Sequence, residues 1–279
     1  MEVNERHIKH LIFRVREIRD SVENQKGVWL GKSTKKWLQS AKNGYNGDWR
    51  KDIGLDPIVS EDRPYYRDEL KDLIHIGKSN FGAIDNSFVR WCVANIFTWG
   101  GQGTRYARAS QQIGNWDNWK KPCFQLLRDE IEAVEAYACF HALHNSGDMY
   151  GVGPAFYTKL IFFLGKGDGL IMDQWTSRSV NLLFNRKIVA LSRGKIKKNK
   201  DYYYAVKKSN DRNAYEKYIQ AISELSKRLS LELKCDIDPS KTEEYIFSLT
   251  TDRKKTKLTV DEYCRATRWR QYVEKHIEL

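Results

Sequence analysis

Apolar residues recur at spacings of three and four along most of the chain, which is the pattern of an amphipathic α-helix. The first such run predicts a helix from His7 to Val22, with apolar positions at Ile8, Leu11, Ile12, Val15 and Ile18. Alternation of apolar and polar residues, which is typical of strands, is scarce. The pattern therefore predicts a protein that is mainly all-α.

Cap and turn residues bound the other predicted helices. Asn86 or Ser87 suits the cap of the next helix, and Pro122 suits the first turn of the one after it. The predicted helices are 86–97, 123–144, 154–164, 174–184, 214–233, 241–249 and 260–277. The segments 188–191 and 202–206 are candidate strands, and 21–66 and 99–114 are predicted to form short helices, loops and turns.

The net charge is the feature of the composition that indicates which kind of molecule the protein binds. The net charge of +12 favours a polyanionic partner, because each neutralised phosphate releases condensed counterions. The alternative is a basic surface without a partner. Residues 186–208 hold nine Lys or Arg and one Asp, and they form either a solvated loop or strand pair or an arm that faces phosphates.

The five cysteines form no CxxC pair, so we expect no metal site and no cofactor. Their wide spacing suits reduced thiols in the cytosol. The N-terminal stretch lacks the apolar core of a signal peptide, and no apolar run approaches the length that spans a membrane. We therefore expect a soluble, cytoplasmic protein with no membrane partner.

The stretch GVGP, residues 151–154, opens the apolar run AFYTKLIFFL. Two glycines allow a tight turn between helices and remove the side chains that would hold a ligand away from the backbone. The amides of Gly153, Ala155 and their neighbours would then lie at the positive end of a helix, where one phosphate fits. The alternative is a packing joint between two helices with no ligand.

The wording GVGPAFYTKLIFFL, followed by IMDQW, resembles the helix-hairpin-helix DNA glycosylase superfamily, and in particular its prokaryotic 8-oxoguanine-glycosylase-like branch. In that family a catalytic Asp follows the hairpin, and here Asp173 lies 22 positions after Gly151. The resemblance covers about 124–184. It implies a helix-hairpin-helix glycosylase-type helical fold with elaborated N- and C-terminal segments. We expect one helical unit over 1–279, with a catalytic core at 86–184 and a basic helical extension at 185–279.

Asp173 directly precedes a predicted helix, where Asp is a favoured N-cap. The resemblance implies a second role, in which the carboxylate stabilises the cationic sugar as the base departs and orients or deprotonates the attacking water. The two roles are compatible, because amide bonds to a carboxylate favour its charged form.

Two departures from the family pattern affect the expected chemistry. Bifunctional members carry a Schiff-base lysine two residues after the second hairpin glycine, and that position is Ala155 here. Lys159 lies one helical turn further, and we consider it for a phosphate contact, a structural ion pair or a catalytic role. Several relatives hold a four-cysteine iron–sulfur cluster after the Asp, but only Cys235 and Cys264 occupy that half of this chain.

The remaining site candidates follow from what a glycosylase must do to reach a base inside a duplex. It must extrude the nucleotide and stack the base against flat or apolar side chains. Trp175, Phe97 and Trp99 are the candidates for this pocket. The candidates for binding DNA phosphates are Gly151, Val152, Gly153, Ala155, Arg105 and Arg108.

The resemblance predicts a monomeric, monofunctional DNA N-glycosylase that flips out a modified base of double-stranded DNA, excises it and leaves an abasic site. The substrate is either an oxidised purine or a modified base of phage DNA, such as a glucosylated one, in which case the role is anti-phage defence. Two alternatives stay open. One is a non-catalytic helix-hairpin-helix DNA-binding module, and the other is a helical scaffold or RNA-binding protein that uses the basic 186–208 segment.

Overall fold

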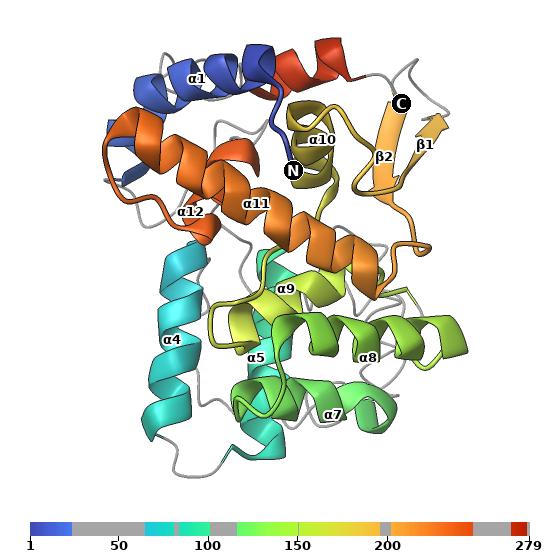
Figure 1. The fold of residues 1–279 in the computed structure, drawn as a ribbon. Helices are drawn as coiled ribbons and strands as arrows, with labels where there is room; N and C mark the ends of the chain where they lie inside the picture. The colour runs from blue at the N-terminus through green and yellow to red at the C-terminus, as the bar shows by residue number, and fades with distance from the viewer. Residues whose placement is uncertain are drawn as a thin grey trace. The chain divides into compact units, whose positions relative to one another are not determined.

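The structure is a computed structural model that describes residues 1–23, 65–80, 84–100, 116–149, 151–195, 202–247 and 269–277. Helices form nearly all of the secondary structure of these residues, and a two-stranded sheet is the exception (Figure 1). The predicted all-α class is confirmed.

Contacts divide the chain into two compact units. The hairpin unit comprises Leu30–Gly169, and the terminal unit comprises Met1–Trp29 together with Leu170–Leu279. The division that the sequence predicts, between a core at 86–184 and an extension at 185–279, stays a prediction.

α9, Pro154–Leu164, is the central helix of the hairpin unit. All of its residues except Ala155 are buried, as expected for a helix that is apolar on every face. It packs against four other helices, namely α4 (Arg67–Asn80), α5 (Asn86–Trp99), α7 (Trp116–Leu127) and α8 (Ala133–Ser146). The turn that precedes α9 is therefore attached to the core of this unit.

The helix predicted over 123–144 is wrong, because α7 and α8 divide this region between them. Pro122 lies inside α7, which starts six residues earlier. The indoles of Trp116 and Trp119 are buried, and Trp116 Nε1 donates to Asn86 Oδ1 at 2.7 Å. The free energy gained by burying these two rings exceeds the cost of the backbone hydrogen bond that proline removes from a helix interior.

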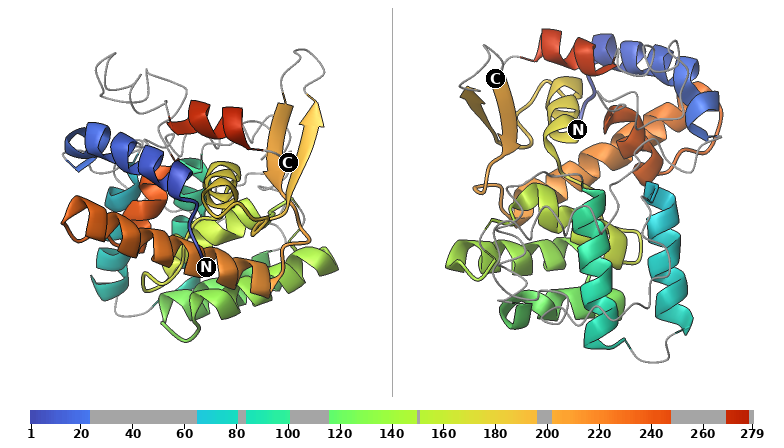
Figure 2. Two further views of the ribbon diagram at one scale, coloured as in Figure 1. Left: turned by 45° about the horizontal axis from the view of Figure 1, so that its top comes forward. Right: turned by 180° about the vertical axis from the view of Figure 1, so that it is seen from behind.

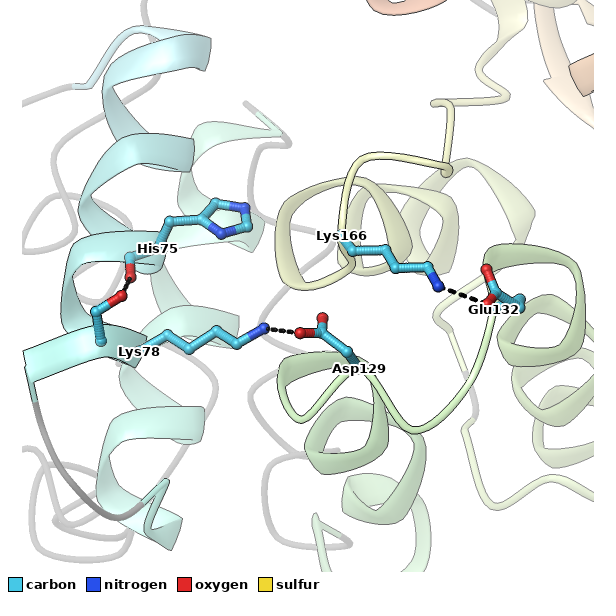
Figure 3. A network of polar contacts seen from close by, with 6 residues as sticks. His75, Lys78, Asp129, Glu132 and Lys166 are labelled. Carbon is cyan, nitrogen blue, oxygen red and sulfur yellow. Dashed lines mark hydrogen bonds and ion pairs between the residues drawn. The ribbon is translucent and has the colours of Figure 1, made fainter.

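Charged side chains close the end of the α8–α9 pair that lies away from the turn (Figure 3). Lys166 Nζ, after α9, lies 2.5 Å from Glu132 Oε1, before α8. Asp168 Oδ2 accepts from the first amide of α8 at 2.8 Å, and burial raises the pKa of Asp168. Lys78 of α4 adds an ion pair of 2.6 Å with Asp129, whose φ of 57° turns the chain between α7 and α8.

α10, Gln174–Leu183, is the central helix of the terminal unit. It packs against α1 (Glu5–Glu23), α11 (Arg212–Leu233), α12 (Pro239–Phe247) and the strand β2 (Tyr202–Val206). β2 pairs in antiparallel register with β1 (Leu191–Lys195). Residues 269–276 are also helical, and Figure 2 shows them alongside α1. Asp173, which directly precedes α10, is thus held at the centre of this unit.

The candidate strand at 202–206 is confirmed as β2, but the one at 188–191 is wrong except for its last residue. Two asparagine side chains bind the backbone there, and Lys207 N, just after β2, also donates to Ala190 O at 2.9 Å. The amide group of Asn181 bonds to both backbone groups of Val189, at 2.8 and 2.9 Å. The amide group of Asn210 does the same for Ala190, at 2.7 and 2.9 Å. Local side chains thus satisfy the backbone that an apolar run led us to place in a strand.

The other predicted helices agree with the structure within a few residues where it describes them. α5 is capped by Asp85, whose Oδ1 accepts from Phe88 N at 2.8 Å, rather than by Asn86 or Ser87. The predicted C-terminal helix is seen over 269–276, and its earlier part lies outside the described residues. Most of the predicted loops at 21–66 and 99–114 lie outside them as well.

Candidate active site

The turn between α8 and α9 is built from two glycines with different conformations. Gly151 has a φ of +82°, a left-handed conformation that favours glycine. Gly153 has extended angles, φ −87° and ψ −175°, and is the N-cap of α9. Val152 between them is fully buried. A Cβ on either glycine would meet no heavy atom within 4 Å, so the space beside both is open.

The backbone N–H groups of this turn form a candidate anion-binding site. Those of Gly151, Gly153 and Ala155 have no acceptor among the residues that the structure describes. The next two amides donate to Gly153 O at 2.8 and 3.2 Å, and Pro154 has no N–H to satisfy. Unpaired donors at the positive end of a helix, beside open space, suit a phosphate group.

Asp173 caps α10, as expected from its place before a helix. Its Oδ1 accepts from Trp175 N at 2.7 Å and from Thr176 N at 3.0 Å. Thr176 Oγ1 accepts in return from Asp173 N at 3.1 Å, which completes a capping box. Both amide bonds use the same carboxylate oxygen. Within the described part of the chain, no hydrogen bond to Asp173 Oδ2 is found.

The segment that leads to Asp173 is buried and pairs with no strand among the described residues, and side chains bind its backbone. α11 supplies two tyrosine hydroxyls, and α12 supplies one carboxylate. Tyr215 bonds to both backbone groups of Leu170, Tyr218 donates to Ile171 O, and Glu243 accepts from Ile171 N, at distances of 2.6 to 3.0 Å. The position of Asp173 is thus set from two helices that are distant in sequence.

A protein-family comparison covers both the turn and Asp173. The family described as "Putative 8-oxoguanine DNA glycosylase OGG-like protein" matches residues 48–247, which is well over half of the chain. The chain belongs to this family. It matches no curated protein and no solved structure. Membership in the OGG-like family confirms the resemblance that the turn and Asp173 carry, and it indicates DNA as the substrate.

In this OGG-like chain, Lys159 is the first lysine after the turn, and its side chain is buried and hydrogen-bonded. Lys159 is only 7% exposed. Its Nζ donates to Ala155 O at 2.6 Å and lies 5.2 Å from the centre of the Phe156 ring. Ala155 itself is partly exposed. Roles for Lys159 in catalysis or phosphate binding stay predictions.

Two guanidinium groups lie over the ring of the predicted pocket residue Trp175. Arg270 Cζ is 3.9 Å and Arg178 Cζ 4.5 Å from the ring centre. Arg178 also lies 4.3 Å from the Tyr204 ring, and its nearest carboxylate oxygen belongs to Glu274, at 3.9 Å. Burial lowers the pKa of Arg178. The indole is partly exposed, so a base that stacks on it would share the ring with these cations.

The other two pocket candidates lie in the core of the hairpin unit. Phe97 is fully buried, with its ring centre 6.3 Å from those of Trp119 and Phe156. Trp99 packs edge-to-face on Phe163, with ring centres 4.9 Å apart. For either ring to contact a flipped base, the neighbouring side chains would have to move.

The predicted phosphate-binding residues Arg105 and Arg108 lie outside the described residues, as does Cys264. The other four cysteines are free thiols. Among the described residues, no group of three or more His, Cys, Asp or Glu side chains is arranged to hold a metal ion. In the same part of the chain, no helix has the length and apolar character needed to cross a membrane.

Sequence reasoning missed the residues that surround Asp173 and Trp175, namely Tyr215, Tyr218, Glu243, Arg178 and Arg270. The only available signal was the three-residue spacing of the two tyrosines, which places them on one face of a helix. Such a spacing is equally typical of plain core residues. Nothing in the local sequence separates the buried Glu243 from a solvated carboxylate.

Proposed function

We propose that the protein is a monofunctional DNA N-glycosylase in which Asp173 is the catalytic carboxylate. The observation that carries this proposal is the Asp173 carboxylate itself, in a chain of the OGG-like family. One oxygen is fixed by two amides, and the other has no hydrogen-bond partner in the described part of the chain. The family pattern assigns catalysis to a carboxylate after the hairpin, and a pure DNA-binding module would not need that carboxylate.

The carboxylate acts as the bond between the base and C1′ breaks. The electron pair leaves with the base, which takes a proton from solvent, and the deoxyribose takes on the positive charge of an oxocarbenium ion. Asp173 Oδ2 stabilises that charge and accepts a proton from the water that adds to C1′. The products are the free base and an abasic site.

The turn at 151–153 binds a DNA phosphate. Backbone amides contact phosphates without reading the sequence, so this contact sets the register of the strand rather than the choice of base. A glycine at position 153 leaves the amides open to the phosphate oxygens.

The reaction stops at the abasic site. The position that carries the Schiff-base lysine in bifunctional relatives holds Ala155, and Lys159 Nζ is bonded to the carbonyl of that residue. Neither Ala155 nor the hydrogen-bonded Lys159 therefore offers an amine to the sugar.

The substrate is an oxidised purine in duplex DNA, and the enzyme acts as a monomer. The choice of an oxidised purine rests on the 8-oxoguanine named in the family's description. A modified base of phage DNA is the rival substrate, and it would give the enzyme a role in defence.

Base release from defined DNA tests the proposal. Wild type is incubated with a duplex that holds one 8-oxoguanine opposite cytosine, and separately with phage genomic DNA that contains glucosylated hydroxymethylcytosine. Released bases are identified by mass spectrometry. Asp173→Asn should bind the duplex as wild type does and release no base, since asparagine caps helices equally well.

Asp211→Asn is the matched control. Asp211 is the N-cap of α11, where Ala214 N donates to its Oδ1 at 2.9 Å. This variant should keep the wild-type rate. Base release by Asp173→Asn at the wild-type rate would remove the catalytic assignment. Tight duplex binding by wild type without release of any base would favour the non-catalytic binding module.

A further inference from the structure

The backbone that carries Asp173 is held by side chains that no part of the proposed chemistry uses. Tyr218 Oη donates to Ile171 O at 2.8 Å, and Glu243 Oε2 accepts from Ile171 N at 2.6 Å. Both side chains are buried, and Glu243 is 2% exposed. One residue, two positions before Asp173, is thus clamped through both of its backbone groups.

A buried carboxylate beside a buried hydroxyl is a costly arrangement unless every polar atom has a partner. Here the backbone of Ile171 is a partner of both side chains. Thr176 Oγ1 donates to the same Ile171 carbonyl at 2.9 Å and belongs to the capping box of Asp173. The clamp and the cap therefore share a residue.

Two nearby carboxylates, those of Glu243 and Asp173, act on the Tyr218 hydroxyl. Burial, followed by the negative charges of Glu243 and Asp173, raises the pKa of Tyr218 well above its ordinary value. The phenol therefore stays protonated and acts as a donor at any pH at which an enzyme works. A protonated Tyr218 keeps Ile171 in place whether or not Asp173 is ionised.

We infer that Tyr218 and Glu243 are positioning residues for Asp173, which fix the backbone of Ile171 and thereby the direction of Asp173 Oδ2. This inference rests on the proposed function of Asp173. A displacement of about 1 Å in a reacting group can cost on the order of 100-fold in rate, which is why such a clamp matters.

The test compares Tyr218→Phe and Glu243→Gln with wild type. Both substitutions keep the size of the side chain. Phenylalanine removes the donor to Ile171 O, and glutamine replaces the charged acceptor of Ile171 N with a weaker, neutral one. Single-turnover base release from the 8-oxoguanine duplex should slow about tenfold or more in Tyr218→Phe, while the affinity for the duplex stays within about twofold. Thermal unfolding measures any loss of stability separately.

Ser226→Ala is the matched control. Ser226 also lies on α11. Its hydroxyl donates to the carbonyl of Ile237, a loop residue that is distant from Asp173 in the sequence. This variant should lose stability without losing rate. A purely structural role for Tyr218 predicts that both variants behave alike.

Amide hydrogen exchange gives a readout that does not depend on activity. The amides of Ile171, Trp175 and Thr176 report the clamp and the cap. They should exchange faster in Tyr218→Phe and Glu243→Gln and at the wild-type rate in Ser226→Ala. Unchanged exchange in the first two variants would overturn the inference, as would faster exchange with an unchanged rate of base release.

The two proposals fail in different ways. If wild type releases no base from any DNA, the proposed function fails, and exchange still decides whether Tyr218 and Glu243 hold the cap. If wild type is active and depends on Asp173, but Tyr218→Phe matches it in both readouts, only the positioning role is lost.

Discussion

Asp173 and Thr176 bind each other twice at the start of α10. The Thr176 amide donates to Asp173 Oδ1 at 3.0 Å, and the Asp173 amide donates to Thr176 Oγ1 at 3.1 Å. Thr176 is fully buried, and its hydroxyl also donates to Ile171 O. The proposed catalytic carboxylate is therefore part of the local fold, so changes to its partner should affect stability and rate together.

Thr176→Val removes the hydroxyl and keeps the shape of the side chain. It removes one of the two acceptors of the Asp173 amide, which also donates to Ile171 O at 3.1 Å, and it removes the hydroxyl that donates to Ile171 O. The loss of a hydrogen bond of this kind costs about 0.5–1.5 kcal/mol. We expect a lower free energy of unfolding by that amount and slower base release, measured by urea unfolding and by single-turnover kinetics. Wild-type values of both would show that the reciprocal bond contributes nothing.

Thr242→Val is the control for this substitution. Thr242 is also fully buried, but its hydroxyl has no hydrogen-bond partner within the described part of the chain. Replacing an unpaired buried hydroxyl by a methyl group should leave stability unchanged or raise it. A large loss in this variant would mean that the loss in Thr176→Val reflects packing rather than the capping box.

Local chemistry explains which parts of the fold were predictable. α9 begins and ends where the sequence predicts, because proline, glycine and a run of apolar residues act within a few positions of one another. The cap at Asp173 was predictable for the same reason, since Asp before a helix accepts amides of the next turn. The turn glycines belong to this class as well.

Non-local contacts explain what the sequence did not reveal. α4 was not predicted, since its buried face includes Arg67 and Gly77 beside Leu70 and Ile74, which breaks the apolar spacing. The break between α7 and α8 depends in part on Asp168, which lies 35 residues after the amide it binds. The clamp on Ile171 depends on residues 47 and 72 positions away.

The two turn glycines should respond differently to alanine. Gly151 has a φ of +82°, where an L-residue is strained by about 1–2 kcal/mol, so Gly151→Ala should lower the free energy of unfolding by that amount. Gly153 has an extended backbone and open space beside it, so Gly153→Ala should fold as wild type does.

Gly153→Ala should nevertheless bind DNA more weakly, because the new methyl group stands where a phosphate would approach the amides. Loss of one charge-assisted hydrogen bond, about 1.5 kcal/mol, weakens binding roughly tenfold. Fluorescence anisotropy with a labelled duplex measures this. Wild-type affinity in Gly153→Ala would argue for a simple packing joint at this turn.

Borohydride trapping tests the absence of lyase chemistry. Wild type should form no covalent complex with DNA, since Ala155 has no amine and Lys159 Nζ is bonded to Ala155 O. Ala155→Lys places an amine at the position of the family's Schiff-base lysine and should yield a trapped complex. Trapping of wild type that disappears in Lys159→Met would instead identify Lys159 as a nucleophile.

The histidines that join the two ends of the chain should make stability depend on pH. In the terminal unit, His10 of α1 stacks on Tyr272 with ring centres 3.8 Å apart, and His7 Nδ1 lies 2.9 Å from Tyr272 Oη. Burial is the main cause that lowers the pKa of both histidines; His276 lowers both further, as does Arg14 for His10.

A histidine whose pKa is lowered in the folded state binds fewer protons there than in the unfolded chain. This difference exists at pH values between its pKa in the folded state and its pKa in the unfolded chain, about 6.5. The stabilising contribution is therefore complete above pH 6.5 and decreases as the pH falls through that window. His10→Phe keeps the stacked ring but cannot be protonated. Its urea midpoint should decrease less than that of wild type between pH 7 and 5.5, and equal decreases would show that His10 does not titrate on unfolding. Comparing the two proteins cancels the shared contribution of carboxyls such as Asp168, whose pKa is shifted in both.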